Sequence, residues 1–464
     1  MKKNITCIIL CLAALSLSSC KTLYGKYERP DVKTSGIVRD VASDTDTLAV
    51  KDTTTFANIP WRSVFTDPQL QSIIEKGLNN NVNLLNAALN VKMAEEQLKC
   101  AKLAFVPSLS FTPQGTIASW DGNAATKTYS LPVTASWTVD LFGNLLSQKR
   151  SAQMALLQLK DYQVSVQTNL IANIANMYYT LLMLDKQVEL VNNMEGLTKD
   201  TWETMQKMHD LRLGYRTPAI QSAESNYYSV LTQKTDLLRQ IRETENSLSL
   251  LIGDQAHSIA RGKLDNQSLP SNFSTGVGIQ LLNNRADVHA AEMNLAQCFY
   301  GVETARSKFY PSITISGTGA LTNSGGMGIV NPGKWLLSAV GSLTQPIFQN
   351  GRIIAGLKVA KMQYEQAYNT WQNTVLKAGS EVSNALVLYN YSDEKSKIEQ
   401  KRIEVLEKNV ESTKELMGIA GSSYLEIIQA QSSLLNVQLS KVADDFYKMQ
   451  AVVNLYYALG GGAK

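Results

Sequence analysis

The chain has 464 residues, a formal net charge of +4, 44 % hydrophobic residues and 18 % charged residues. Its length allows about three ordinary domains, and its apolar content argues against a disordered protein. The small net charge and the absence of a basic block argue against a nucleic-acid-binding protein.

The first twenty residues have the pattern of a bacterial export signal. Two lysines precede an apolar stretch, residues 5–17, that is too short to span a bilayer as a helix. The stretch ends in LSSC, which resembles a lipoprotein processing motif. In such lipoproteins the chain is cut before the cysteine, which is then acylated, so the resemblance implies lipidation of Cys20. Lys21 in place of Asp implies sorting to the outer membrane. An ordinary secretory signal with an incidental cysteine is the alternative.

Only two cysteines remain outside this region, Cys100 and Cys298. Two cysteines make no disulfide framework, and we expect both to be buried small residues. No other stretch reaches 18 consecutive apolar residues, so the sequence predicts no transmembrane helix.

One phrase occurs twice in the chain. FVPSLSF begins at Phe105, and FYPSITIS begins 204 positions later at Phe309. A second pair of similar stretches begins at Gly214 and Gly421, at an offset of 207. This predicts a tandem duplication with halves of about 200 residues. We expect a signal peptide at 1–19, a lipidated extension at 20–70, a first repeat at 71–270 and a second repeat at 271–464.

Long stretches without proline indicate where helices run. No proline lies inside residues 133–217 or after Pro346, and apolar residues recur there at steps of three and four. This predicts a nearly continuous helix over 145–211 and a second over 219–252 that folds back. The second half repeats the pattern with a break at 418–421. Helices of this length with polar faces suit an extended bundle or the wall of a hollow structure.

Alternation with period two follows each proline of the repeated phrase. It covers residues 109–117 and 129–141 in the first half, and 313–319 and 335–343 in the second. About ten residues with one apolar and one hydroxyl-bearing face suit a tilted membrane-spanning strand, although a half-buried strand of a soluble sheet has the same pattern. Four strands cannot close in a membrane, where open edges leave backbone groups unpaired. Spanning strands would therefore have to be pooled by two or three chains.

Together these stretches resemble the TolC-like family of outer-membrane efflux channels, in its lipoprotein branch. The resemblance covers essentially the whole mature chain and rests on order and spacing rather than on one motif. A departure is Ala286, where the family usually has Pro in an Arg-Pro-Asp motif. The stretches are the lipoprotein motif, YERP from Tyr27, IPWRSVFTDPQLQSII from Ile59, NNNVNLLNAALNV from Asn79, LLNNRADVHAAEMNLA from Leu281, both copies of the phrase, and ALGGG from Ala458.

The resemblance implies a mainly α fold with a membrane β-barrel. Three protomers would pool four strands each into a twelve-stranded barrel, continued across the periplasm by a hollow α-helical barrel. The implied function is a passive outer-membrane exit channel for drugs and toxic small molecules. The implied partners are a homotrimer, a periplasmic adaptor (membrane fusion) protein, an inner-membrane RND or ABC transporter and outer-membrane lipid, with no nucleic acid. The alternatives are the exit duct of an ABC-driven type I protein or peptide secretion system, and a lipid-anchored coiled-coil spacer without a pore.

The resemblance also implies an adaptor contact at the two hairpin tips. Glycines there can adopt turn dihedrals that other residues resist. A structural turn without a partner is the alternative. The residues implied in adaptor contact are Leu211, Arg212, Leu213, Gly214, Gly421 and Ser422.

A periplasmic gate is implied shortly after the second tip. Leu425 and Gln429 lie four residues apart, on one face of the expected helix, with Glu426 beside them. Similar family members carry an apolar residue and a carboxylate at the Leu425 and Gln429 positions, which form a ring in the trimer. Here Gln429 replaces the acid, while Glu426 could supply three carboxylates that favour cations. A solvated charge on a helix surface is the alternative.

The sequence predicts no catalysis. None of the three histidines forms a pair with metal-ligand spacing, and Gly-x-Ser-x-Gly does not occur. GIVNPGKW, residues 328–335, approaches a P-loop but ends in Trp where Ser or Thr would hold Mg²⁺. We therefore expect neither an enzyme nor a bound cofactor or metal.

Overall fold

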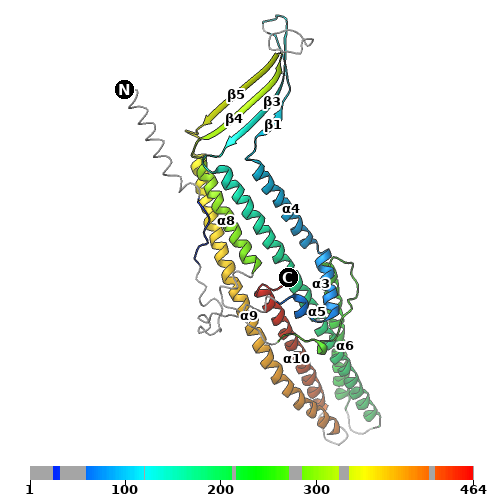
Figure 1. Ribbon diagram of the computed structural model, residues 1–464. Helices are drawn as coiled ribbons and strands as arrows, with labels where there is room; N and C mark the ends of the chain where they lie inside the picture. Colours follow the sequence, from blue (N-terminus) through cyan, green and yellow to red (C-terminus); the bar gives the residue numbers. More distant parts are fainter. Residues whose placement is uncertain are drawn as a thin grey trace. The chain divides into compact units, whose positions relative to one another are not determined.

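Two series of helices and strands with nearly equal lengths follow each other along the chain (Figure 1). The computed structural model describes residues 25–31, 59–119, 121–211, 216–270, 285–322, 334–416 and 424–462. The first series is α4 (Val82–Leu103), β1 (Ser108–Phe111), β2 (Gln114–Ala118), β3 (Thr126–Val139), α5 (Asn144–Asp210) and α6 (Thr217–Leu251). The second is α8 (Ala286–Ser307), β4 (Ser312–Thr322), β5 (Lys334–Thr344), α9 (Arg352–Leu416) and α10 (Tyr424–Ala458). The short α2 (Trp61–Val64) and α3 (Pro68–Asn80) precede the first series, and η4 (Leu264–Asn266) lies between the two.

Corresponding helices of the two series match closely in length. α4 and α8 each have 22 residues, α5 and α9 have 67 and 65, and α6 and α10 each have 35. The tandem duplication predicted from the sequence is therefore confirmed. The predicted domain bounds stay a prediction.

The chain divides into two units, which we name by their content. The strand unit comprises Met1–Val32, Leu89–Asp161 and His289–Thr374, and the helical unit comprises Lys33–Ala88, Tyr162–Val288 and Val375–Lys464. The predicted helices over 145–211 and 219–252 agree with α5 and α6 within two residues. At a rise of about 1.5 Å per residue, α5 is on the order of 100 Å long. The predicted break at 418–421 lies outside the described residues.

The strand unit contains one antiparallel sheet. β3 pairs with β1, β2 and β4, and β4 pairs with β5, so β1 with β2 forms one edge and β5 forms the other (Figure 1). The predicted strand over 109–117 is wrong in one respect, because it is split between Phe111 and Gln114. Pro113, which has no backbone N–H to donate, lies at the interruption. Both pieces still pair with the long β3.

The repeated phrase is the connection from a helix to a strand. α4 ends at Leu103 and α8 at Ser307, four residues before each proline of the phrase, as expected because proline and its preceding residue disfavour continuation of a helix. Each connection is tied to the following strands by a side-chain N–H. Trp137 Nε1 donates to the Phe105 carbonyl oxygen at 3.0 Å, and Gln345 Nε2 donates to that of Phe309 at 3.1 Å. The aromatic residue of the phrase thus supplies a backbone acceptor that fixes each connection.

The core of the helical unit lies among α5, α6, α9 and α10. One cluster joins the middle of α5, including Tyr178 and Leu182, to α3, α9 and α10. A second joins Val191 of α5 to Val230 of α6, Ile403 of α9 and Leu434 of α10. The steps of three and four read from the sequence therefore mark the side of each long helix that packs against the other three.

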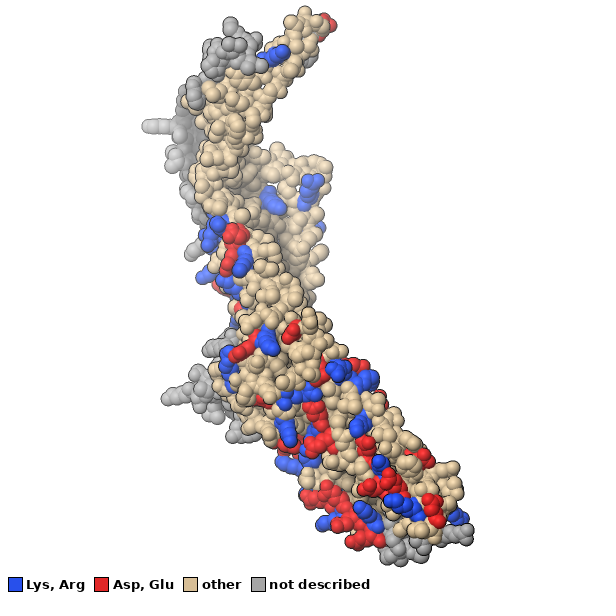
Figure 2. Space-filling view, turned by 90° about the vertical axis from the view of Figure 1, so that its right-hand side faces the viewer, with Lys and Arg blue, Asp and Glu red and all other residues tan. Residues whose placement is uncertain are grey.

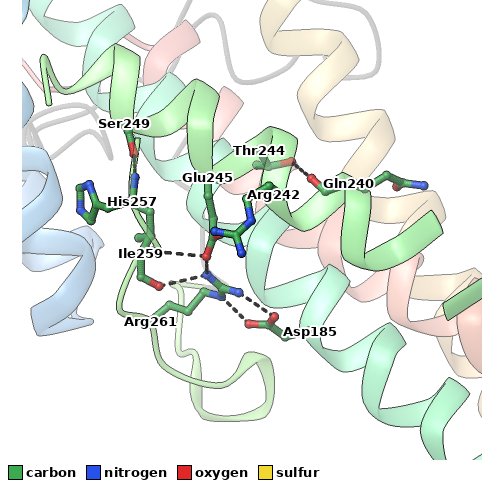
Figure 3. Close-up of polar contacts among 9 residues, drawn as sticks. All are labelled: Asp185, Gln240, Arg242, Thr244, Glu245, Ser249, His257, Ile259 and Arg261. Atoms are coloured by element: carbon green, nitrogen blue, oxygen red, sulfur yellow. Dashed lines mark hydrogen bonds and ion pairs between the residues drawn. The ribbon is translucent and has the colours of Figure 1, made fainter. Parts of the chain in front are cut away.

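Ion pairs from Arg261 to two helices fix the connection that follows α6 (Figure 3). Arg261 donates through Nε and Nη2 to both carboxylate oxygens of Asp185 on α5, at 2.5 and 2.9 Å. Its Nη1 donates to Oε1 of Glu245 on α6 at 2.6 Å, and the Glu245 side chain is only 5 % exposed. Arg261 therefore compensates a buried carboxylate and joins both helices of the first hairpin to the connection.

Two further expectations concern cysteines and membrane helices. Cys100 is exposed and Cys298 is half-buried, so the expectation that both are buried is wrong. Leu98 is buried on α4, and a residue two positions later points to the opposite side of a helix. Among the described helices, none is both long enough and apolar enough to cross a bilayer.

Candidate functional site

The structure describes four of the ten predicted site residues. Leu211 directly follows α5 and is 69 % exposed, and Leu425, Glu426 and Gln429 lie in the first turns of α10. The six others lie outside the described residues: Cys20, Arg212, Leu213, Gly214, Gly421 and Ser422. Their predicted roles stay predictions.

The start of α10 packs onto the first hairpin through the face opposite its candidate gate residues. Ile427 and Ala430 are each 2 % exposed, and Ile428 packs against a cluster of Met205, Ala219, Ile220 and Ala223 from α5 and α6. The candidate gate side chains are exposed in the single chain, Leu425 to 60 %. They therefore take no part in the packing of α10 onto the first hairpin.

Glu426 also has a local structural role. It is an acidic residue in the first turn of α10, where the partial positive charge of the helix N-terminus favours a carboxylate. This interaction needs no gate. The helix N-terminus therefore accounts for the position of Glu426.

Sequence reasoning missed two polar contacts that join α10 to the first hairpin. Gln431, 1 % exposed, donates from Nε2 to Thr201 Oγ1 of α5 at 2.8 Å. Ser432 Oγ donates to Asn226 Oδ1 of α6 at 3.3 Å. A signal was available, because Gln431 follows Ile427 by four positions and so lies on the apolar side of the helix. Buried hydrogen bonds of this kind specify how helices pair.

The sheet of the strand unit has an exposed apolar face. Its register places most apolar residues opposite apolar residues and most hydroxyl residues opposite hydroxyl residues, for example Leu337 opposite Gly319 and Thr134 opposite Thr318. Exceptions are Ser316 opposite Val340 and Ile117 opposite Lys127. Apart from Lys127 and Lys334, its strands contain no Asp, Glu, Lys or Arg. Accordingly, Figure 2 shows few blue or red atoms over the strands. The side chains most exposed on the apolar face, between 60 % and 81 %, are Leu109, Phe111, Ile117, Leu337 and Leu343.

Two helices carry exposed apolar stripes. They are α4, which leads into the β1 edge of the sheet, and α9, which follows the β5 edge. The spacing of each stripe is helical, so it occupies one face. The stripe residues are Val82, Leu85, Leu89 and Met93 on α4, and Leu376, Val387, Tyr391, Ile398 and Val405 on α9.

In the described part of the chain, no group of three or more His, Cys, Asp or Glu side chains is arranged to hold a metal ion.

Comparison with known proteins places these features in context. The pattern that defines the family described as outer membrane efflux protein matches residues 73–254 and 278–461. The chain is 25 % identical over 459 residues to the cation efflux system protein CusC of Escherichia coli K12, covering 97 % of this chain and 98 % of that protein. It is 26 % identical to the toluene efflux pump outer membrane protein TtgC of Pseudomonas putida, covering 87 % and 85 %, and 23 % identical to the probable outer membrane lipoprotein SilC of Salmonella typhimurium, covering 96 % of each.

Solved structures agree in fold. A crystal structure of CusC superposes with a TM-score of 0.82 at 22 % identity, covering 94 % of this chain and 99 % of that chain. The open-state MtrE outer membrane channel of Neisseria gonorrhoeae superposes with a TM-score of 0.82 at 23 % identity, covering 95 % and 98 %.

Proposed function

Because this chain belongs to the outer membrane efflux protein family, we propose that it is the homotrimeric, passive outer-membrane exit channel of a tripartite efflux pump. It works with a periplasmic adaptor and an inner-membrane transporter of the RND type. The cargo consists of small toxic molecules or ions.

The open apolar sheet is the observation that carries this proposal. Its apolar face is exposed, its strands are nearly free of charge, and both of its edges are unpaired within the described chain. In a bilayer such a sheet has to close, because unpaired backbone groups in hydrocarbon are costly. One chain supplies a width of four strands, below the lower limit of about eight for a membrane barrel. Three copies supply twelve.

The exposed helix stripes support the same assembly. Along the chain, α4 precedes β1 at one sheet edge, and α9 follows β5 at the other. A ring in which α4 and β1 of one protomer meet α9 and β5 of the next would pair both edges and cover both stripes. Such head-to-tail contacts close into a ring when the rotation between copies is right. A pore-free coiled-coil spacer would not need this sheet.

The cargo is inferred from the relatives. Two of them are named for cation efflux and toluene efflux, which favours small molecules and ions over secreted proteins. The exit duct of an ABC-driven type I secretion system stays the alternative. Because a wide passive duct contributes little selectivity, we assign the choice of cargo to the transporter.

The predicted sites keep their roles within this proposal. The hairpin tips, with Leu211 at the described end of α5, contact the adaptor. Leu425, Glu426 and Gln429 of α10 form rings that constrict the periplasmic end. The exposure of the three α10 side chains is compatible with this arrangement.

The segment 25–31 supports a lipid anchor at Cys20. Arg29 forms a bidentate ion pair with Glu292 of α8, and the Tyr27 backbone N–H donates to the Tyr300 hydroxyl at 3.3 Å. Arg150 of α5 donates to the Gly25 carbonyl oxygen at 3.2 Å. Five residues span at most about 18 Å, so an acylated Cys20 would hold lipid within that distance of Gly25 on the strand unit.

Conductance and mass measurements test the proposal. The protein purified in detergent should have the native mass of three chains and should conduct ions across a planar bilayer without an energy source. A host that lacks its own exit channels should regain tolerance to toxic compounds only when this chain is expressed with a matching adaptor and transporter. A monomer without conductance would overturn the proposal.

A further inference from the structure

A buried polar layer interrupts the apolar contact between α9 and α10. Val382 and Ala385 of α9 belong to the apolar cluster before it, and Ile403 and Val410 belong to the cluster after it. Between them, Lys395 and Ser396 of α9 contact Asp444 and Asp445 of α10 at 3.0 and 2.7 Å. The proposed function assigns no role to this layer.

Two carboxyl groups at the centre of the layer each have one oxygen without a donor. The side chains of Glu399 on α9 and Asp444 on α10 are only 5 % and 4 % exposed. Glu399 Oε1 accepts from the Ser440 hydroxyl at 2.7 Å, and Asp444 Oδ1 accepts from Lys395 Nζ at 3.0 Å. The second oxygen of each, Glu399 Oε2 and Asp444 Oδ2, is buried without any donor. A buried carboxylate oxygen without a donor carries a substantial desolvation cost.

One shared proton satisfies both oxygens. The Glu399 and Asp444 carboxyls lie beside the same Lys395 Nζ, at 3.9 and 3.0 Å, and two neighbouring buried carboxylates cannot both ionise cheaply. Lys395 Nζ is closer to Asp444 than to Glu399, so Asp444 has the nearer compensating cation. A proton on Glu399 Oε2 would provide a donor for Asp444 Oδ2, the other oxygen without one. Burial also raises the pKa of Glu399 above its ordinary value.

We propose that Glu399 and Asp444 hold one proton between them, and that this proton makes the contact between α9 and α10 sensitive to pH. Loss of the proton leaves two buried charges side by side and favours separation of the helices at this layer. α10 also carries the candidate gate residues Leu425, Glu426 and Gln429. If the proposed channel function holds, the layer therefore couples pH to the opening of the periplasmic end.

The other lysines near the layer pair with carboxylates other than Glu399 and Asp444. Asp393 is paired with Lys397 and Lys448, and Asp445 with Lys441. Asp445 and Lys448 also line a cleft with Asp265 of the connection, and Asp265 pairs with Lys186 of α5. The titratable groups described on or beside the layer include Tyr389, Asp393, Lys395, Lys397 and Glu399 of α9, Lys441, Asp444, Asp445, Tyr447 and Lys448 of α10, Asp265 and Lys186.

The direction of the pH effect follows from linkage. Because the pKa of Glu399 is raised in the folded protein, its contribution to helix pairing is complete below its ordinary pKa of about 4.3 and is lost as pH rises through the raised value. Between these two pKa values, release of one proton on opening increases the equilibrium constant for opening by up to about tenfold per pH unit.

Infrared spectroscopy on the purified full-length protein tests the shared proton directly. Wild type should show the carbonyl stretching band of a protonated carboxylic acid at pH values where exposed carboxyls are ionised. Glu399→Gln and Asp444→Asn should each remove this band. Glu407→Gln, which changes an exposed carboxylate on the same helix, should keep it. Absence of the band in wild type, or its persistence in both layer variants, would overturn the proposal.

Hydrogen exchange tests the effect on the helices. After correction for intrinsic exchange, the amides of residues 393–399 and 440–445 should lose protection as pH rises in wild type and in Glu407→Gln. In Glu399→Gln the amide group cannot ionise, so protection should no longer depend on pH. The same pH dependence in Glu399→Gln as in wild type would overturn the proposal.

Conductance distinguishes this inference from the channel function. Wild type should open more often as pH rises, whereas Glu399→Gln should not respond. A conducting protein without this difference would overturn the coupling to the gate alone. A protein that never conducts would overturn the channel function and leave the infrared and exchange results as the test of the proton pair.

Discussion

Arg261 shows how much one residue outside any helix contributes to the helical unit. Its guanidinium is 14 % exposed and compensates the buried Glu245 carboxylate as well as Asp185. Removal of one member of a buried ion pair leaves an uncompensated charge, which destabilises a protein by about 3–5 kcal/mol. Arg261→Ala should therefore lower the unfolding temperature clearly, as measured by circular dichroism in detergent.

Arg239 provides the matched control. It pairs with Glu243 at 2.7 Å, but both side chains are more than half exposed, so Arg239→Ala should leave the unfolding temperature nearly unchanged. Equal effects of the two substitutions would contradict the role assigned to Arg261.

The stability of the strand unit should depend on pH through His289. Its Nδ1 lies 2.6 Å from Asp161 Oδ2, and this hydrogen bond holds the pKa of His289 above its ordinary value. The charged form is therefore favoured in the folded protein. The resulting stabilisation is complete below about pH 6.5 and is lost as pH rises through the raised pKa. The unfolding temperature of wild type should fall over this range.

His257 serves as the control for this prediction. His289→Gln should flatten the dependence of the unfolding temperature on pH, whereas His257→Gln, at an exposed position, should keep it. Because the His289 side chain is 39 % exposed, the effect should be modest. An unchanged slope in His289→Gln would rule out this ion pair as its source.

At the scale of elements, local patterns predicted most of the fold. The bounds of α5 and α6 were predictable because proline ends helices and because apolar steps of three and four extend between prolines. Hydroxyl alternation likewise located β3, β4 and β5. The division between β1 and β2 was missed because the alternation continues through Thr112 and Pro113, where pairing is interrupted.

The polar contacts between elements were not predictable in the same way. Arg261 reaches Asp185 across 76 positions, and Asp444 lies 45 positions from Glu399. Such pairs depend on how the helices pack, and a single sequence carries no periodic signal for a charge partner. The candidate gate residues were found only through resemblance, since exposed side chains near a helix start carry no pattern of their own.

A lysine on the apolar face of a strand should impair assembly, whereas a lysine on the hydroxyl face should not. Leu337 of β5 lies on the apolar face, 81 % exposed, and its neighbour Ser338 lies on the hydroxyl face. A lysine that faces lipid near the bilayer centre destabilises a barrel by about 2–4 kcal/mol, but one that faces water does not. Leu337→Lys should therefore reduce the amount of protein assembled in the outer membrane, measured by quantitative blotting of membrane fractions. Equal assembly of Leu337→Lys and Ser338→Lys would contradict a lipid-facing apolar surface.

At the scale of the whole molecule, a single chain leaves apolar helix stripes exposed and, within its described residues, both sheet edges unpaired. The α9 stripe is exposed over Val387, Tyr391, Ile398 and Val405, to between 39 % and 69 %. Fully burying an apolar side chain contributes roughly 1.5–3 kcal/mol, so a stripe repeated at three interfaces would hold a trimer together. Ile398→Ser combined with Val405→Ser should therefore shift the native mass from three chains towards one.

The position of the stripe on α9 provides the control for this prediction. Gln400 and Glu407 are exposed, and each lies two positions after a stripe residue, so they occupy a different side of the helix. Gln400→Ser with Glu407→Ser should keep the trimer at the same protein concentration. Both double variants should retain their helical circular dichroism, because neither removes a buried side chain of the single chain. If the stripe variant stays fully trimeric, or the control dissociates equally, α9 does not provide the contact between protomers.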